Sequence, residues 1–507
     1  MDPGSVLLTV VTGAIVAFLY WLYSFAVAPF RVLSRIGVRG PPPIPFYGNQ
    51  KMVVKEGKLN FFTKMFETYG NVFGYYLGQR VIIVIKDIEL IKEVTVKKCN
   101  NFSDRPPQPV LLKRGSAPRG LLNAEGAYWK KLRVTLSPSF SASKMKMMAP
   151  LIEEHCQTLE SILSENADTD KSTDVTLAFG NLSLETIIAA AFGRSIDIQR
   201  GESDELLTAA EGIMARVREG AELSLERIIT LLSNFPWMAS VLRLLASRSK
   251  SGAHYQTLAR VSLALIRARR QAPDAQQSYK DLLQLMLDAT ADGKEEHRKL
   301  TDEEVMAQCI TFIVAGYETT SSLLSFTAYL LAKNPEVQDR LVGEIEAYLT
   351  EHPDSTPYEK ALGIPYLDMV VQESMRVMPP VSSTNRYCVE STTVGDWKVP
   401  AGTVIIIPIW HLHHDPQYWP QPHKFDPDRF TDEEKDKRPA LAHMPFGMGP
   451  RNCIGMRFAL LEAKLALITI LCKYKFVPAP ETEDPLQLIH GVTSSPKNPL
   501  FLRVVSH

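Results

Sequence analysis

The sequence predicts a single large, mainly α-helical domain with a minor β part, preceded by one N-terminal transmembrane helix. Three observations lead to this fold class. Residues 3–30 carry no charge, residues from about 125 to 350 have mostly helical patterns, and strand-like runs are few and short. No internal repeat, low-complexity tract or linker after residue 50 divides the remainder.

The N-terminal segment is long and apolar enough to cross a bilayer. Apolar residues run almost continuously over 6–28, and about 20 suffice for a transmembrane helix. A cleaved signal peptide is the alternative, because residues 26–28 (Ala-Val-Ala) resemble a cleavage site, but the run is too long and Pro29 stands where the cut would fall. Asp2 precedes the span and three arginines, Arg31, Arg35 and Arg39, follow it, so the positive-inside rule predicts a cytosolic body.

The chain then divides into three parts. We expect the membrane anchor in residues 1–30, a basic and proline-rich linker in 31–50, and the globular domain in 51–507. The prolines fix backbone angles, so the linker should act as a stiff spacer. The apolar segment 231–245 has two interpretations that stay open, core packing or contact with the bilayer surface.

Six local patterns predict individual secondary-structure elements. Residues 71–95 read as a short hairpin rather than a large sheet, and strand-like pieces cover 393–398 and 403–408. A helix of roughly thirty residues opens with a capping box at Thr301 and Glu304 and stops at Asn334. We expect a second helix over Tyr366–Val377 and a last long helix just after Gly455.

Composition excludes several classes of protein. The 56 basic residues balance the 56 acidic ones, so no overall field favours nucleic acid. The six cysteines are widely scattered and form no C-x-x-C pair, which argues against a disulfide framework or a zinc ribbon and favours a reducing compartment.

Residues 446–455 read Phe-Gly-Met-Gly-Pro-Arg-Asn-Cys-Ile-Gly and match F-x-x-G-x-R-x-C-x-G at every fixed position. Here the sequence resembles the cytochrome P450 family, and the resemblance extends over nearly the whole chain. It implies a cytochrome P450-type fold in which Cys453 is the axial ligand of the iron of haem b. A buried, inert cysteine is the usual alternative for a lone cysteine. The glycines and the N-terminus of the following helix would favour a thiolate.

The resemblance also implies roles for neighbouring side chains. Arg451 would pair with a haem propionate, and Phe446 would pack beside the thiolate and limit its contact with water. Further cofactor-binding residues carried over from the family are Arg105, Trp129, Arg133 and Arg386. An exposed arginine is the alternative for each arginine.

Residues 315–320, Ala-Gly-Tyr-Glu-Thr-Thr, resemble the family's oxygen-activating signature. The resemblance implies that Thr319 and Glu318 are catalytic, the first as a hydrogen-bond partner of the reduced oxygen and the second as a proton source. Back-bonding within the helix is the alternative for Thr319, and an ordinary solvated face the alternative for Glu318. Gly316 in mid-helix predicts a local distortion.

Glu373 and Arg376 lie three residues apart on one helix face, like the family's E-x-x-R pair. With Arg429 they resemble the charge network that locks the fold behind the cysteine loop. Their loss should prevent haem incorporation more than alter catalysis.

The resemblance is closest to the microsomal branch that oxidises drugs and steroids and that also includes thromboxane synthase. It implies a haem-binding catalytic domain at the endoplasmic reticulum membrane that inserts one oxygen atom of O2 into a lipophilic steroid, lipid or xenobiotic. Electrons would come from NADPH-cytochrome P450 reductase, with cytochrome b5 as a further candidate. Two rivals remain. A peroxide isomerase would need no reductase, and a non-catalytic membrane carrier would need no intact cysteine loop.

Overall fold

The computed structural model describes residues 2–106, 119–169, 171–194, 196–203, 205–218, 250–271, 281–291, 300–491 and 493–507. These residues group into two compact units. Unit 1 contains residues 2–106 and 383–408, and unit 2 contains the described parts of 107–222, 243–382 and 409–507. The segment 231–245 lies outside the described residues, so its two interpretations stay open.

Unit 1 is built on a four-stranded sheet with the strand order β1-β2-β7-β4. The hairpin strands β1 (Val72–Leu77) and β2 (Arg80–Ile85) pair antiparallel. β7 (Val404–Ile407) runs parallel to β2, and β4 (Thr384–Tyr387) pairs antiparallel with β7. The predicted hairpin is therefore confirmed, and two further strands extend it to a sheet of four. The strand-like run at 393–398 is itself a hairpin of β5 (Thr392–Val394) and β6 (Trp397–Val399).

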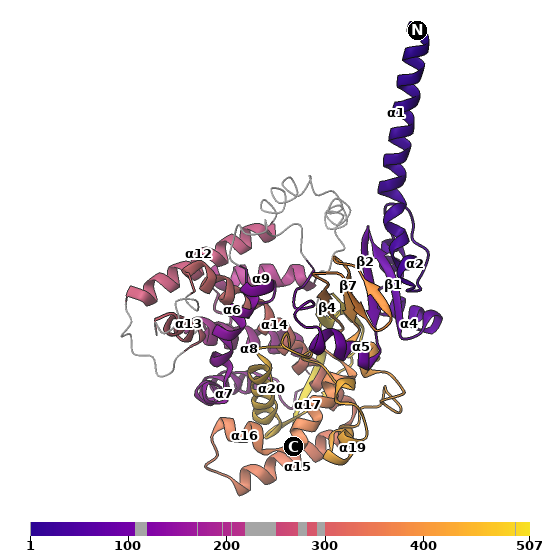
Figure 1. The fold of residues 1–507 in the computed structure, drawn as a ribbon. Coiled ribbons are helices and arrows are strands. Elements are labelled where there is room, and N and C mark those ends of the chain that lie inside the picture. The colour runs from indigo at the N-terminus through magenta and orange to yellow at the C-terminus, as the bar shows by residue number, and fades with distance from the viewer. Residues whose placement is uncertain are drawn as a thin grey trace. The chain divides into compact units, whose positions relative to one another are not determined.

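Unit 1 contains the helices α2 (Val32–Ile36), α3 (Gln50–Glu56), α4 (Lys58–Tyr69) and α5 (Ile88–Lys92). Helix α4 packs on the sheet through aromatic side chains. Phe61 and Phe62 of α4 contact Phe73 and Tyr75 of β1, and all four rings are almost completely buried. The remaining helix, α1 (Pro3–Ala26), extends away from the β1–β2 end of the unit (Figure 1).

Helix α1 has the properties of a membrane span. Its apolar side chains are exposed along its length, and its 24 residues correspond to about 36 Å of helix against a hydrocarbon core of about 30 Å. A second helix, α8 (Val175–Phe192), is also long and apolar, but 78% of its apolar window is buried inside the protein. That burial identifies α8 as a core helix.

Unit 2 holds most of the helices. In chain order they are α6 (Gly126–Leu136), α7 (Ala142–Ser164), α8, α9 (Glu205–Arg218), α12 (Lys250–Gln271), α13 (Leu282–Ala291), α14 (Asp302–Lys333), α15 (Pro335–Glu351), α16 (Pro357–Gly363), α17 (Pro365–Val377), α18 (Ile409–His413), α19 (Asp432–Asp436) and α20 (Met456–Leu471). Its strands are β3 (Thr173–Asp174), β8 (Tyr474–Pro478), β9 (Leu488–His490), β10 (Ser494–Pro496) and β11 (Phe501–Ser506), in the orders β3-β11-β8 and β10-β9.

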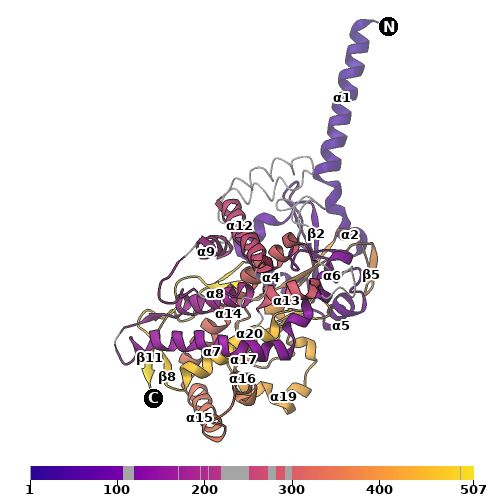
Figure 2. The same cartoon turned by 90° about the vertical axis from the view of Figure 1, so that its left-hand side faces the viewer.

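The long helix α14 is the centre of unit 2 and packs against α8, α12, α17 and α20. Helices α7, α20 and α17 lie side by side (Figure 2). The capping box predicted at Thr301 is present, because its hydroxyl accepts from the N–H of Glu304 and the Glu304 carboxylate accepts from the N–H of Thr301. The predicted helices at 366–377 and after Gly455 are confirmed as α17 and α20.

Gly316 also has a packing role. α14 is helical without interruption from Asp302 to Lys333, and the local distortion at Gly316 stays a prediction. A Cβ atom at Gly316 would lie 2.9 Å from Cγ1 of Ile187 on α8. The glycine therefore permits close packing of α14 on α8, which is the other common reason for glycine inside a helix.

Candidate functional site

The loop before α20 is folded back on itself so that Cys453 is presented at its end. Gly447 and Gly449 have φ of 71° and 75°, a backbone region that side chains with a Cβ rarely adopt. The N–H of Cys453 donates to the carbonyl of Phe446 at 2.9 Å and closes the loop. The ring of Phe446 is partly buried against the core of unit 2, so it holds one side of the loop in place.

Cys453 differs from the other five cysteines in being exposed, whereas Cys99 and Cys472 are partly buried and the remaining three are buried. Surrounding protein nevertheless raises the pKa of the Cys453 thiol, and the Gly455 N–H and the positive charge of Arg133 act in the opposite direction. A coordinating metal cation deprotonates such a thiol outright. An accessible sulfur with nearby N–H and guanidinium groups fits an iron ligand.

Helix α6 supplies two of the predicted residues beside this loop. Trp129 and Arg133 are one turn apart and share a helix face. Arg133 donates to the backbone carbonyl of Asn452 at 3.0 Å and to its Oδ1 at 2.6 Å. Arg451 lies with its guanidinium carbon 4.3 Å from the centre of the Trp129 ring and donates to the carbonyls of Leu121, at 3.0 Å, and Ala124. The structure thus brings Cys453, Arg133, Trp129 and Arg451 together.

The other two predicted arginines lie together in unit 1. Arg105 donates to Oδ1 of Asn385 at 3.2 Å, while its buried Nε atom has no hydrogen-bond partner among the described residues. Burial, and secondarily the charge of Arg105, lower the pKa of Arg386 to about 9. Two neighbouring buried cations are costly unless an anion binds them. The two propionates of haem b are such anions, so these residues fit the group.

One stripe of α14 is accessible although most of the helix is buried. Thr311, Ala315 and Thr319 follow one another at intervals of four residues and are exposed or half-buried. The Thr319 hydroxyl donates to the carbonyl of Ala315 at 2.7 Å, which is the back-bonding expected of a mid-helix threonine. Its oxygen lone pairs remain available to accept a hydrogen bond. To donate elsewhere, the hydroxyl must leave Ala315.

Glu318 is not on a solvated face, because only 2% of its surface is exposed. Its Oε2 accepts a hydrogen bond from the hydroxyl of Thr493 at 2.7 Å. Thr493 lies between β9 and β10, 175 residues further along the chain. Glu318 is thus a buried carboxylate, next to Thr319 in the chain, that is hydrogen-bonded to a second hydroxyl.

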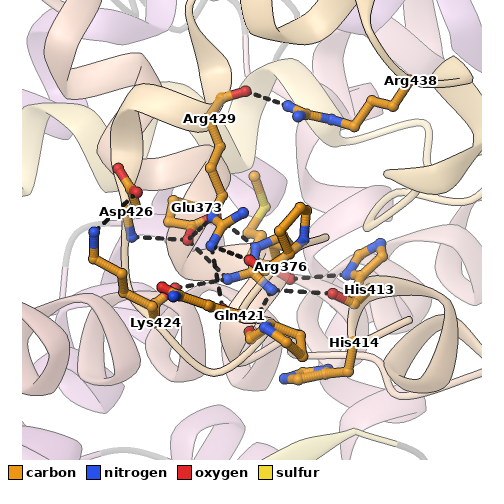
Figure 3. A network of polar contacts seen from close by, with 12 residues as sticks. Glu373, Arg376, His413, His414, Gln421, Lys424, Asp426, Arg429 and Arg438 are labelled. Atoms are coloured by element: carbon orange, nitrogen blue, oxygen red, sulfur yellow. Dashed lines mark hydrogen bonds and ion pairs between the residues drawn. The ribbon is translucent and has the colours of Figure 1, made fainter. Parts of the chain in front are cut away.

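Figure 3 shows a fully buried ion pair between Glu373 and Arg376. Arg376 donates to both carboxylate oxygens of Glu373, at 2.6 and 2.8 Å. It also donates to three backbone carbonyls, those of His413, Pro422 and Lys424, at 3.0, 2.7 and 3.0 Å. The same carboxylate accepts from the N–H of Asp426 at 2.9 Å, and Nε of Arg429 lies 3.5 Å from it. The predicted network of Glu373, Arg376 and Arg429 is thus present.

His413 connects this network to the cysteine loop and was not anticipated from the sequence. Burial lowers its pKa well below the ordinary value, so the ring is neutral. Its Nε2 accepts from the N–H of Met444 at 3.0 Å, which places the proton on Nδ1, 3.3 Å from the carbonyl of Met375. The sequence offers His411, His413 and His414 within four residues, and nothing in that run distinguishes the middle one.

Comparison with known proteins agrees with this arrangement. The family model "Cytochrome P450" matches residues 38–503. The chain is 35% identical to cytochrome P450 3A56 of Fundulus heteroclitus, over 97% of both chains. It is 36% identical to cytochrome P450 3A7 of Homo sapiens, over 96% of this chain and 94% of the relative, and 35% identical to cytochrome P450 3A29 of Sus scrofa, over 97% and 95%. The chain belongs to the cytochrome P450 family and is a haem-containing monooxygenase.

Proposed function

We propose that this monooxygenase inserts one oxygen atom of O2 into a lipophilic substrate, a steroid, a lipid or a xenobiotic. NADPH-cytochrome P450 reductase would supply the electrons, and cytochrome b5 is a candidate second donor. The observation that carries the proposal is the Cys453 site, an accessible thiol on a glycine-shaped loop beside Arg133.

We assign the cofactor-binding roles as follows. Cys453 would hold the iron, Arg105, Arg133, Arg386 and Arg451 would serve the propionates, and Trp129 and Phe446 would pack around the group. When bound, haem with a thiolate ligand supplies one-electron and oxygen chemistry. The contacts of Arg133 with Asn452 and of Arg451 with the carbonyls of Leu121 and Ala124 hold both guanidinium groups close to the cysteine loop.

Two side chains of α14 would handle protons. The Thr493 hydroxyl donates to Glu318, so Glu318 is held as an acceptor until that hydrogen bond is released. Rotation of the Glu318 side chain away from Thr493 would free it to carry a proton to the accessible stripe. Thr319 lies in that stripe, and its hydroxyl would leave the Ala315 carbonyl to donate there. Ala315 offers a lipophilic substrate a small apolar surface on the same face.

The proposed location is the endoplasmic reticulum membrane with the catalytic domain in the cytosol. Three exposed arginines, Arg31, Arg35 and Arg39, follow α1, and Asp2 precedes it. Basic residues remain preferentially on the cytosolic side of a span. This supports the orientation in which α1 inserts with its N-terminus across the membrane.

Replacing Cys453 by serine tests the ligand. The full-length Cys453→Ser protein should lose the red-shifted Soret band of the reduced carbon monoxide adduct, because a hydroxyl does not provide a thiolate. Cys472→Ser is the matched control, since Cys472 lies at the other end of α20 and is also partly accessible. The band should survive there. A normal band in the Cys453→Ser protein would remove the proposed ligand.

The electron source is tested separately. Product should form from a lipophilic substrate only when NADPH and the reductase are both present. Turnover of a lipid hydroperoxide with neither of them would instead identify a peroxide isomerase.

A further inference from the structure

Lys58 is a lysine of unit 1 whose side chain pairs with no carboxylate among the described residues. It is partly buried, and its ammonium group donates a hydrogen bond to the hydroxyl of Ser383 at 2.5 Å. Burial lowers the pKa of Lys58 to about 8, and no anionic group acts in the opposite direction. A cation removed from water is costly unless an anion binds it.

The place of Lys58 in its helix adds to this cost. Lys58 is the first residue of α4, and no side chain caps this end of the helix. The N-terminal end of a helix carries a partial positive charge, which repels a lysine and attracts an anion. A bound anion would therefore relieve both the burial of the charge and its unfavourable position.

Rigid elements hold Lys58 at the edge of the sheet. Phe61 and Phe62, in the next turn of α4, are buried in an apolar cluster with residues of β1, β2 and β7. The hydrogen bond from Lys58 reaches Ser383, which directly precedes the edge strand β4. The ammonium group is thus positioned by a packed helix and a strand rather than by a loose loop.

Ser383 offers a second donor beside the ammonium group. Its oxygen accepts from Lys58, and its own hydroxyl hydrogen has no acceptor among the described residues. The two donor atoms are 2.5 Å apart. They match the two oxygens of a carboxylate, which accepts hydrogen bonds from charged donors especially well.

The pair lies close to the residues assigned to the haem propionates. Asn385, which accepts from Arg105, is two residues beyond Ser383, and Arg386 is three residues beyond it. Residues of a strand advance about 3.3 Å each, so these positions lie within about 10 Å of Ser383 along the chain. An anion at Lys58 would thus be a neighbour of the cofactor.

We propose that Lys58 and Ser383 bind the carboxylate of a lipophilic acid, and that the monooxygenase thereby selects acidic lipids as substrates. The inference rests on the proposed function, because the bound acid would be the molecule that is oxidised. With its carboxylate fixed at the cation, such an acid would be oxidised at a carbon further along its chain.

Spin-state titrations of the full-length haem protein test this site. They compare dodecanoic acid with its methyl ester, which has the same chain but no charge. The variants are Lys58→Met, which removes the charge, and Lys58→Arg, which keeps it. Lys55→Met is the matched control, because Lys55 is an exposed lysine in the last turn of α3. Haem content and the reduced carbon monoxide spectrum are measured for each protein.

Lys58→Met should lower the affinity for the acid about ten- to a hundredfold, as expected for loss of a charged hydrogen bond, and leave the affinity for the ester unchanged. Lys55→Met should change neither affinity. The parent protein should lose affinity for the acid as the pH rises through about 8, because Lys58 then loses its proton. Lys58→Arg should keep its affinity over the same interval, because arginine stays charged.

An unchanged ratio of acid affinity to ester affinity in Lys58→Met would overturn the inference, while ester binding would leave the proposed function intact. A fall in the haem content of that variant would also overturn it, because Lys58 would then serve a propionate. A parent protein without the carbon monoxide band would refute the proposed function and, with it, this inference.

Discussion

Replacing Arg376 by lysine keeps the positive charge of the side chain but should destabilise the protein strongly. Arg376 makes five hydrogen bonds, two to Glu373 and three to the carbonyls of His413, Pro422 and Lys424. A lysine has three donors on one nitrogen and cannot reach all of these acceptors. Each buried acceptor left without a partner costs about 1–3 kcal/mol. Breaking a buried pair costs about 3–5 kcal/mol, and we expect a loss of this size in the free energy of unfolding.

Arg340→Lys provides the matched comparison. Arg340 is also on a helix and also pairs with a carboxylate, that of Asp428 at 2.9 Å, but the two side chains are 47% and 56% exposed. Exposed pairs contribute about 0–1 kcal/mol. Urea unfolding of both variants, followed by circular dichroism and by the carbon monoxide band, gives the two midpoints. Equal midpoints for Arg376→Lys and Arg340→Lys would refute the assignment of fold stability to the buried network.

Three further outcomes are expected. Burial raises the pKa of Glu462 from 4.5 to about 8, because the folded state favours the protonated carboxyl group. The resulting contribution to the free energy of unfolding is complete below pH 4.5 and is lost as the pH rises towards about 8. Glu462→Gln should therefore gain stability relative to the parent protein across that interval, by a few kcal/mol at order of magnitude, and a difference that does not change with pH in urea titrations would contradict this. Thr319→Ala should retain haem but consume more NADPH per product formed, whereas unchanged coupling would assign Thr319 to helix packing alone. Thr493→Val removes the hydrogen bond to Glu318 and should alter the solvent isotope effect on turnover while leaving the carbon monoxide spectrum unchanged; an unaltered isotope effect would separate Thr493 from proton transfer.

Features encoded in neighbouring residues could be predicted from the sequence. The capping box of Thr301 and Glu304 spans four residues, and the pairing of Glu373 with Arg376 follows from helix geometry. The hairpin of β1 and β2 was likewise visible. Its extension by β7 was not, because the partner strand lies more than 300 residues further along the chain and short apolar runs do not specify their partners.

The contacts of the candidate site were harder to predict, as three residues show. Thr493 reaches Glu318 from a loop 175 residues away, and threonine in a loop carries no distinguishing pattern. The close approach of α14 to α8 at Gly316 depends on the position of Ile187, which the sequence around Gly316 does not specify. His413 was missed because its partners, at Met375 and Met444, are backbone groups that every residue possesses.

Because Arg376 holds the chain from His413 to Lys424 through backbone atoms, it constrains the amino-acid sequence of that stretch only weakly. Its guanidinium recognises carbonyl oxygens, and these are the same whatever side chain is attached. A single distant arginine thus largely fixes the backbone path of this irregular stretch. Side chains at several positions of the stretch can therefore change while its backbone path stays the same.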